Sequence, residues 1–479
     1  MLSTESQASY PAGKLLFFGI VFGIGLVYAS LIPLRYEPLG WHEAIERFGG
    51  LRWLDLNVYR RADWVANGLA VIPFGFLLAG AADRNHAISF RYVLQIVVIM
   101  ACGILLVVLI EFTQLWYPPR TVSGNDIAAG CVGAMVGPVL WLLLGRPYLE
   151  QLNRLKSLPR QELLSPKNAR ILLIIYAALL IAYSIMPLDI MLNLEEWQIK
   201  YQKGRFAWFP NTDITAQDTL AGWLELGSTL FLSSARMLPL GILVYRSKLT
   251  RTALVLLVGF PIILELFQAP IFTRYTTFID ALCGWIGGLL GLMLAANWSH
   301  VTRLNQNKYL RMMLVLTCVL VIELAFNGRY ESLCTAAEIN TNWKYFWAPP
   351  FSKYYYTTEF LAASNFAGKA LTFAVLGFLV ANLQHDRKVL QRDRKVLTKK
   401  MAYWENCFYS GLIFLFAVFV ELPQVYLQPF IADASDVFIY LSGAAIGWRI
   451  YQLLGYWAPD EPPTDLAEKA LPSQHPSRF

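Results

Sequence analysis

Charge, histidine and paired cysteine are scarce in this sequence of 479 residues, and each scarcity excludes a class of protein. Charged residues make up only 15% of the chain, whereas hydrophobic residues make up 56%, and the mean hydropathy is +0.44. A water-soluble core of this size does not need so much apolar sequence. The five histidines lie in predicted loops or the tail without the HExxH spacing of a zinc enzyme, and the six cysteines form no paired CxxC motif. We therefore predict no metal site and no cofactor.

The sequence is instead rich in long runs of apolar residues. A helix needs about 20 apolar residues to cross a bilayer. Runs of this kind number about twelve and fall at residues 14–33, 65–82, 92–117, 126–145, 170–187, 228–245, 252–270, 279–297, 311–327, 366–383, 405–427 and 435–455. The first has no clear cleavage site, so we expect it to stay as a helix. The sequence predicts an all-α, polytopic membrane helix bundle.

The distribution of positive charge predicts an orientation. Loops after even-numbered spans are short and basic, as at Arg246, Lys248 and Arg251, whereas loops after odd-numbered spans are longer and poorer in Lys and Arg. The positive-inside rule then places both termini in the cytoplasm. Membrane topology and contact with anionic lipids explain these basic runs, so we predict no nucleic-acid partner.

One pattern of polar residues and glycines occurs three times with its spacing kept. The three copies are Glu111, Gln114, Arg120, Asp126, Gly133 and Gly137; Glu265, Gln268, Arg274, Asp280, Gly287 and Gly291; and Glu421, Gln424, Phe430, Asp436, Gly443 and Gly447. Only the arginine fails, in the third copy. We infer three parallel four-helix repeats at residues 1–155, 156–305 and 306–455, followed by a disordered cytoplasmic tail at 456–479.

Part of this pattern has a structural explanation from sequence alone. Ser123-x-x-Asp126 and Thr277-x-x-Asp280 fit a capping box, in which the hydroxyl accepts from one orphan N–H and the carboxylate from another. The aspartates are therefore either helix caps or site residues. Glycines four apart indicate close packing of helices through small residues.

Capping does not explain the glutamate, glutamine and arginine. A carboxylate inside a span is costly unless it is paired, and the spacing favours an arginine that neutralises both acids across the hairpin. Either a structural ion cluster or a binding or catalytic cluster fits this pattern. The third copy lacks the arginine but alone has Lys369 on its second helix, which we predict to be the counter-ion, with Glu323 as a competing partner.

The second helix of each repeat and the loop before it add further candidates. Pro73 and Pro239 predict breaks in that helix, and polar residues at Asn67, Ser233 and Arg236 lie outward of them. Charged side chains at such depth normally face a bundle interior or an aqueous cavity. The preceding loops are rich in Trp and Tyr, which suits either an interfacial belt or stacking on a sugar or headgroup.

The residues Asn67, Pro73, Gly75, Glu111, Gln114, Arg120, Asp126 and Gly130 stand at the positions of a family motif, and the chain resembles the VanZ-like membrane proteins. The second repeat departs from the motif at Ser233, and the third at Lys369 and Phe430, so the resemblance is weakest in the third. It implies a bacterial envelope protein of the inner membrane, in a family whose founding member is associated with reduced susceptibility to teicoplanin. It implies no reaction.

These observations predict a membrane protein that binds or handles a lipid or a lipid-linked glycan. The predicted ligand-binding residues are Asn67, Glu111, Gln114, Arg120, Asp126, Arg236, Glu265, Gln268, Arg274, Asp280, Lys369, Glu421, Gln424 and Asp436. The arginines are expected to meet a phosphate or carboxylate. Two alternatives stay open: an enzyme that modifies a lipid or glycan with paired carboxylates, and a scaffold or assembly factor.

Overall fold

The computed structural model describes residues 11–51, 53, 56–83, 89–157, 165–207, 220–328, 330–357, 359–384 and 398–454. Within these ranges the chain is almost wholly helical, and nine helices are long and apolar enough to cross a membrane. For description we divide it at the predicted boundaries of the repeats, which we call the first, second and third units. The tail predicted at 456–479 lies outside the described residues.

The first unit contains four long helices and two shorter ones. Its elements are α1 (Ala12–Leu31), α2 (Trp41–Gly49), α3 (Val58–Ala82), α4 (Phe90–Gln114), α5 (Gly124–Leu140), a π-helical turn η1 (Trp141–Gly145) and α6 (Arg146–Ser157). Pro73 lies inside α3, which stays helical through it. The side chains of Asn57, Ser89 and Ser123 cap the starts of α3, α4 and α5, satisfying one orphan N–H each.

The second unit repeats this order with one helix divided. Its elements are α7 (Pro166–Ile185), α8 (Leu194–Gln202), β1 (Phe206–Ala207), α9 (Leu220–Ala235), α10 (Leu238–Arg246), α11 (Thr250–Gln268), β2 (Thr276–Thr277), α12 (Phe278–Ala296) and α13 (Trp298–Asn305). The break predicted near Pro239 is therefore confirmed within the span at 228–245, whereas the break predicted at Pro73 is wrong, because α3 is continuous through it. Pro239 sits in the first turn of α10, where its missing N–H costs nothing, and a turn at residues 236–237 separates α9 from α10.

The third unit follows the same plan. Its elements are α14 (Lys308–Asn327), β3 (Ser332–Leu333), α15 (Ala336–Phe346), the 3₁₀ turn η4 (Ser352–Tyr356), α16 (Glu359–Leu383), α18 (Thr398–Glu421), the 3₁₀ turn η5 (Leu422–Val425), β4 (Leu427–Gln428) and α19 (Ala434–Leu454). Two-residue strands tie the loop after the first helix to the hairpin turn. Phe206 pairs with Thr276 in the second unit, and Ser332 with Gln428 in the third.

The second and fourth helices of each unit touch backbone to backbone. A Cβ atom added to Gly133 would lie 2.1 Å from the Gly68 carbonyl oxygen, and one added to Gly287 would lie 1.8 Å from that of Ser234. Gly443 meets the Ala370 carbonyl oxygen at 2.1 Å in the same way. No side chain fits at these positions. The prediction that the paired glycines allow close helix packing is confirmed.

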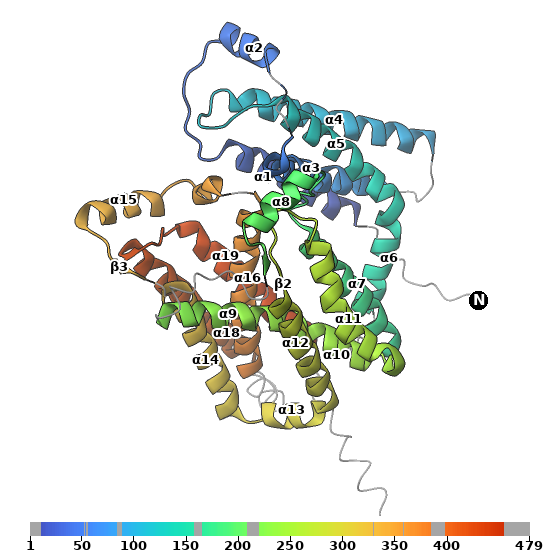
Figure 1. The fold of residues 1–479 in the computed structure, drawn as a ribbon, viewed down its shortest axis with the longest axis vertical. Helices are drawn as coiled ribbons and strands as arrows, with labels where there is room; N and C mark the ends of the chain where they lie inside the picture. Colours follow the sequence, from blue (N-terminus) through green and yellow to red (C-terminus); the bar gives the residue numbers. More distant parts are fainter. Residues whose placement is uncertain are drawn as a thin grey trace, which may run out of the picture.

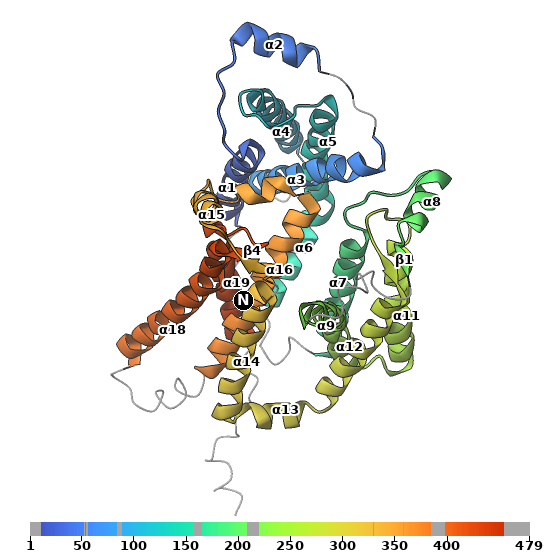
Figure 2. The same cartoon turned by 60° about the vertical axis from the view of Figure 1, so that its left-hand side comes forward.

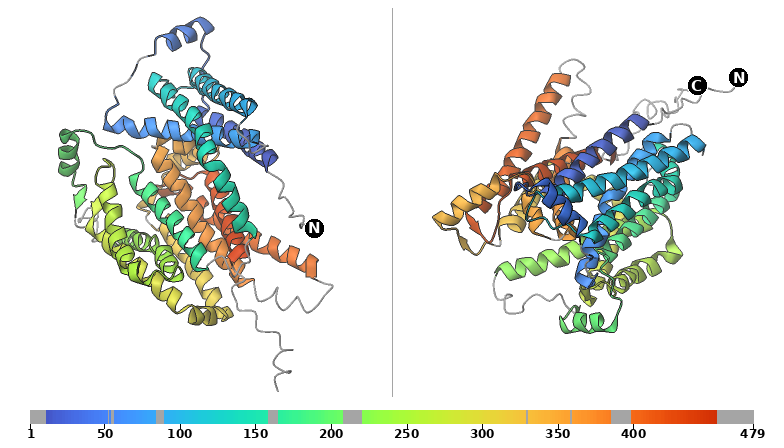
Figure 3. Two further views of the ribbon diagram at one scale, coloured as in Figure 1. Left: turned by 90° about the vertical axis from the view of Figure 1, so that its right-hand side faces the viewer. Right: turned by 90° about the horizontal axis from the view of Figure 1, so that it is seen from above.

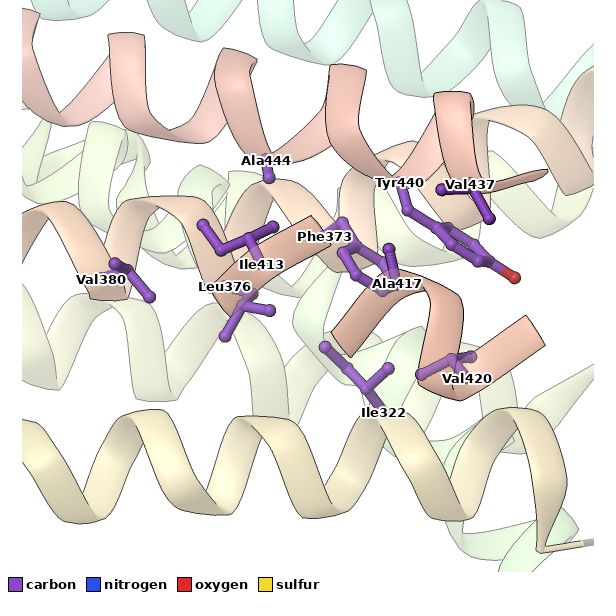
Figure 4. Close-up of a cluster of buried hydrophobic side chains, with 10 residues drawn as sticks. All are labelled: Ile322, Phe373, Leu376, Val380, Ile413, Ala417, Val420, Val437, Tyr440 and Ala444. Atoms are coloured by element: carbon purple, nitrogen blue, oxygen red, sulfur yellow. The ribbon is translucent and has the colours of Figure 1, made fainter. Parts of the chain in front are cut away.

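The apolar core of the third unit lies at this crossing (Figure 4). Phe373 on α16 stacks on Tyr440 of α19, with ring centroids 4.3 Å apart, and Ile322, Ala417 and Val420 pack around them. Figure 4 shows the Tyr440 hydroxyl at the edge of this cluster, directed away from its apolar members. The Tyr440 hydroxyl oxygen therefore lies outside the apolar core, toward the end of the helices.

The first unit is turned relative to the other two. Figure 1 shows α4 lying close to horizontal while α12 and α14 run closer to vertical. In Figure 2 and the left view of Figure 3, α3 crosses the end of α16 rather than running beside it. The units meet at their loop ends: Arg61 of α3 pairs with Glu196 of α8 at 3.0 Å.

Residues 350–357 and Phe360 of the third unit contact both other units. The Tyr355 hydroxyl donates to the Pro119 carbonyl at 3.0 Å, and its ring lies under the guanidinium of Arg120, 4.5 Å away. The Phe360 ring lies 4.8 Å from the guanidinium of Arg274, the equivalent residue of the second unit. One short segment therefore covers the corresponding arginines of two units.

Candidate functional site

The polar residues of the repeated pattern gather where the third and fourth helices of each unit are joined. In the first two units this junction is organised by a hydroxyl cap. The Ser123 hydroxyl donates to Asp126 Oδ2 at 2.6 Å, and the Thr277 hydroxyl donates to Asp280 Oδ2 at 2.6 Å. Each hydroxyl also accepts from the backbone N–H of that aspartate. The hydroxyl half of the predicted capping box is confirmed.

One position on the second helix holds a donor to that same aspartate in every unit. The Asn67 amide donates to Asp126 Oδ1 at 2.7 Å, and the Ser233 hydroxyl donates to Asp280 Oδ1 at 2.6 Å. Lys369 holds this position in the third unit and forms an ion pair with Asp436. The three side chains differ, but each ties the second helix to the start of the fourth.

The glutamate of each unit contacts the backbone N–H of the residue twelve positions further on. Thr277 N–H donates to Glu265 at 3.0 Å, and Asp433 N–H donates to Glu421 at 2.8 Å. In the first unit, the Ser123 backbone N–H is the corresponding donor near Glu111. The capping box is thus wrong in its second half: the glutamate of the third helix, not the aspartate, takes this cap-residue N–H.

The arginines of the first two units hold the end of the unit's first helix. Arg120 donates from Nε to the Ile32 carbonyl and from Nη2 to the Ala29 carbonyl, both at 2.6 Å. Arg274 makes the same fork to the carbonyls of Met186 at 2.7 Å and Tyr183 at 2.5 Å. The spacing favoured a guanidinium that bridges both acids. The structure instead directs it to backbone carbonyls that the helix leaves unpaired.

The third unit has neither the arginine nor the proline that follows the first helix in the other two units. The first helices of the first and second units run into Pro33 and Pro187, whereas α14 ends at Asn327 and is followed by Gly328. Asn327 itself donates to the Val420 carbonyl at 2.9 Å. Phe430 in place of arginine therefore accompanies a different helix end.

We expect Arg274→Lys to destabilise the full chain by about 1–3 kcal/mol, although the charge is kept. A lysine ammonium does not reproduce the planar fork to two carbonyls, and it loses the stacking on Tyr183, 4.6 Å away. The measurement is the unfolding midpoint in detergent. Arg303→Lys, at an exposed position near the end of α13, is the control. Equal midpoints for the two variants would contradict this role.

The glutamines lie beside the same junctions but have different contacts. The Gln114 amide donates to the Ser30 carbonyl at 2.8 Å, which again fixes the end of the first helix. The Gln424 amide, in η5, makes a longer contact of 3.4 Å to the Val420 carbonyl at the end of α18. Gln268 is nearly buried and lines a cavity in the second unit.

That cavity is where the second unit departs from the other two. It measures about 20 Å³, room for a single water molecule. Its polar lining includes Ser233, Arg236, Glu265, Gln268 and Asp280. Arg236 Nη2 lies 3.8 Å from Asp280 Oδ1, with 40% of the arginine side chain and 25% of the aspartate side chain exposed. This is a partly open cluster of both charges.

The third unit has a closed cluster. Glu421 and Asp436 are fully buried, and Lys353 of η4 reaches both: its Nζ lies 2.6 Å from Asp436 and 3.9 Å from Glu421. The Tyr354 hydroxyl donates to Asp436 at 2.8 Å, and the Tyr440 hydroxyl donates to Glu421 at 2.9 Å. Burial by itself lowers the pKa of Lys353, but the two carboxylates outweigh it and raise that pKa, which keeps the ammonium charged.

The predicted counter-ion role of Lys369 is confirmed by its pair with Asp436. Glu323, the competing partner, instead accepts from Asn327 at 2.8 Å. Lys353 and Tyr354 were not predicted as site residues. Two signals pointed to them: the loop carries a lysine directly before its run of three tyrosines, and a unit without its arginine has one cation too few for two buried acids.

Within the described residues, no group of three or more His, Cys, Asp and Glu side chains is arranged as metal ligands.

Large apolar side chains are exposed along several helices, including Ile24, Ile174 and Leu415, each more than 60% exposed. An all-α bundle with apolar helices of this length and exposure is a multi-pass membrane protein.

The VanZ/LLP1 family model matches residues 7–145 and 310–455, and the chain belongs to this family. The match falls on the first and third units. The motif residues had indicated that the third unit resembles the family least. The family model corrects this, because it matches the third unit and not residues 146–309. No curated protein and no solved structure matches the chain.

Proposed function

We propose that the chain binds the polar part of a membrane lipid or lipid-linked glycan at the loop ends of its first two units. We place it in the bacterial inner membrane with both termini in the cytoplasm. The helix hairpins end in partly exposed polar clusters, at the depth where headgroups meet the ends of apolar helices. Exposed tryptophans such as Trp41, Trp53 and Trp347, each about 70% exposed, support contact with this layer.

The observation that carries the proposal is the Arg236–Asp280 pair of the second unit. Arg236 keeps 40% of its side chain exposed and stands at a cavity lined by polar groups, whereas Arg274 is held by two backbone carbonyls. A half-exposed guanidinium beside hydroxyl and amide groups fits a phosphate oxygen, which accepts charge-assisted hydrogen bonds from arginine. The third unit, with its acids fully buried, is proposed as scaffold.

Arg236→Ala is expected to weaken binding of an anionic phospholipid about tenfold, the loss of one charge-assisted hydrogen bond. Binding of phosphatidylglycerol to the purified full chain is measured by native mass spectrometry. Arg303→Ala is the matched control, because it removes an exposed arginine from α13, away from the cluster. If both variants bind like the unmodified chain, the proposed site is wrong.

The scaffold alternative has a specific observation in its favour. Arg274, Glu265 and Asp280 of the repeated pattern form hydrogen bonds to other groups of the protein. These residues therefore have a structural role without any ligand. It makes the opposite forecast for the same experiment: Arg236→Ala lowers the unfolding midpoint while lipid binding stays unchanged. Measuring both quantities on each variant separates the two functions.

A further inference from the structure

A large groove lies between helices α1, α3 and α4, at the end of the first unit opposite the cluster of Glu111 and Asp126. It measures about 800 Å³, within the range of roughly 300–1,000 Å³ that is typical of ligand pockets. Arg91 in its lining and Glu111 are about 20 residues apart on α4, which corresponds to roughly 30 Å of helix rise. The groove is therefore separate from the loop ends at which we propose headgroup binding.

The charged side chains of this groove lie at one end of it. Asp83, Ser89 and Arg91 line the end at which α3 finishes and α4 begins. Apolar side chains line the rest, among them Leu78 of α3 and Val98 of α4. All three helices are long and apolar enough to cross a membrane, so the charged end lies near a membrane surface and the apolar part lies deeper. A phospholipid has the same division between headgroup and acyl chain.

Arg91 gives the charged end of the groove a positive charge that no nearby acid neutralises. Asp83, the acid in the lining, is buried and already paired with Arg146, whose Nη2 atom lies 2.7 Å from Asp83 Oδ1. Among the residues that the structure describes, no carboxylate oxygen lies within 4 Å of the Arg91 guanidinium. The exposed guanidinium is therefore available to an anion in the groove.

The first turns of α4 place two further kinds of polar group in line with Arg91. The helix begins here with N–H groups that have no acceptor within the helix, and its first turn contains no acidic residue. Gln95 lines the groove one turn further along, about 6 Å deeper than Arg91. Its amide has no hydrogen-bond partner among the described residues. The ester carbonyls of a phospholipid lie at this depth, because they follow the phosphate on the way to the acyl chains.

We propose that this groove binds an anionic phospholipid of the cytoplasmic leaflet, with its phosphate at Arg91 and an acyl chain along Leu94 and Val98. These two residues are four positions apart and share one face of α4. Arginine forms charge-assisted hydrogen bonds with phosphate oxygens, and basic pockets between transmembrane helices suit anionic headgroups. A zwitterionic headgroup brings a second cation close to Arg91, which disfavours it. This site goes beyond the proposed function, because it lies in the opposite leaflet.

The test maps the position of the lipid on the purified full chain. Phosphatidylglycerol and phosphatidylcholine, each with a photoreactive diazirine at the same position of the acyl chain, are added separately, and the labelled peptides are identified by mass spectrometry. We expect phosphatidylglycerol to label α1 and the first half of α4 about tenfold more than phosphatidylcholine does. Arg91→Ala should remove this preference, whereas Arg303→Ala, at an exposed position on α13, should keep it.

A steric variant tests whether the lipid lies in the groove or only near a positive charge. Val97 and Val98 are neighbours on α4 and are 54% and 52% exposed, but Val98 is part of the groove lining and Val97 is not. Val98→Trp is expected to lower the labelling by phosphatidylglycerol about tenfold, because the indole ring fills the groove. Val97→Trp is the matched control and should leave the labelling unchanged.

Equal labelling by the two lipids overturns the inference, and so does labelling that survives Arg91→Ala or Val98→Trp. An equal loss in both tryptophan variants also overturns it, since the effect would then not depend on the groove. Arg236→Ala separates this site from the proposed function. It should lower the labelling of the second unit and leave that of the groove unchanged. If it changes neither while the groove is labelled as expected, this inference stands and the proposed function fails; the reverse result leaves the proposed function alone.

Discussion

Gly447→Ala is expected to destabilise the third unit by about 3 kcal/mol, the upper end of what added methyl groups cost in packed cores. A Cβ atom there would lie 1.8 Å from the carbonyl oxygen of Ala374 and 2.6 Å from its carbonyl carbon. These are backbone atoms of α16, so no side-chain rotation relieves the contact. The helices α16 and α19 must move apart, and that separates Lys369 from Asp436.

The measurement is the unfolding midpoint of the full chain in detergent, with Gly411→Ala as the matched control. Gly411 lies in α18 with no heavy atom within 4 Å of an added Cβ. Alanine there is expected to be neutral or to stabilise by up to about 1 kcal/mol, because it raises helix propensity. If Gly447→Ala unfolds at the same midpoint as Gly411→Ala, the close crossing of α16 and α19 is wrong.

Lys353→Met is expected to destabilise the chain by about 3 kcal/mol, because it removes a cation from two acids that are fully buried. The loss is at the lower end of the range for broken buried pairs, since Lys369 still pairs with Asp436. Adding Asp436→Asn to Lys353→Met should recover part of the loss, because the buried charge is then removed. A loss in the double variant that is smaller than the sum of the two single losses shows that the two side chains interact.

Chemical denaturation of the full chain gives these free energies for the two single variants and the double variant. Lys344→Met, at an exposed position on α15, controls for loss of a lysine from the same loop region. Additive effects of Lys353→Met and Asp436→Asn would show that the two side chains do not interact, which would contradict the closed cluster.

The sequence predicted the all-α membrane bundle correctly, because long apolar runs leave few other structures in a membrane. The count of about twelve spans stays a prediction, since nine helices among the described residues are long and apolar enough to cross a membrane. It also predicted the glycine crossing, since small residues four apart have one common use. The effect of the prolines was harder to predict, because breaks were expected at both Pro73 and Pro239. Pro73 and Pro239 occupy equivalent positions, yet only the second divides its helix. Sequence periodicity does not tell whether a proline lies inside a helix or begins one.

The candidate site was predicted by residue type but not by partner. Lys369 was paired correctly, because a buried acid without its arginine requires another cation. Arg120 and Arg274 were assigned to the acids nearby in sequence, whereas their partners are carbonyls about 90 residues earlier. Spacing shows which residues share a helix face, but a guanidinium has enough reach and donors to choose a partner on another helix.

The contact between Tyr28 and Pro350 has a consequence for biogenesis. Its two residues are 322 positions apart. At about 5–20 residues per second, the ribosome needs roughly 16 to 64 s to make the intervening chain. In the part of that interval after residue 155 has been made, the complete first unit is without the segment that later covers Arg120. The bonds from Arg120 and Gln114 to the end of α1 join residues that are synthesised early. They give the nascent first unit a means of holding its helices together before the rest of the protein exists.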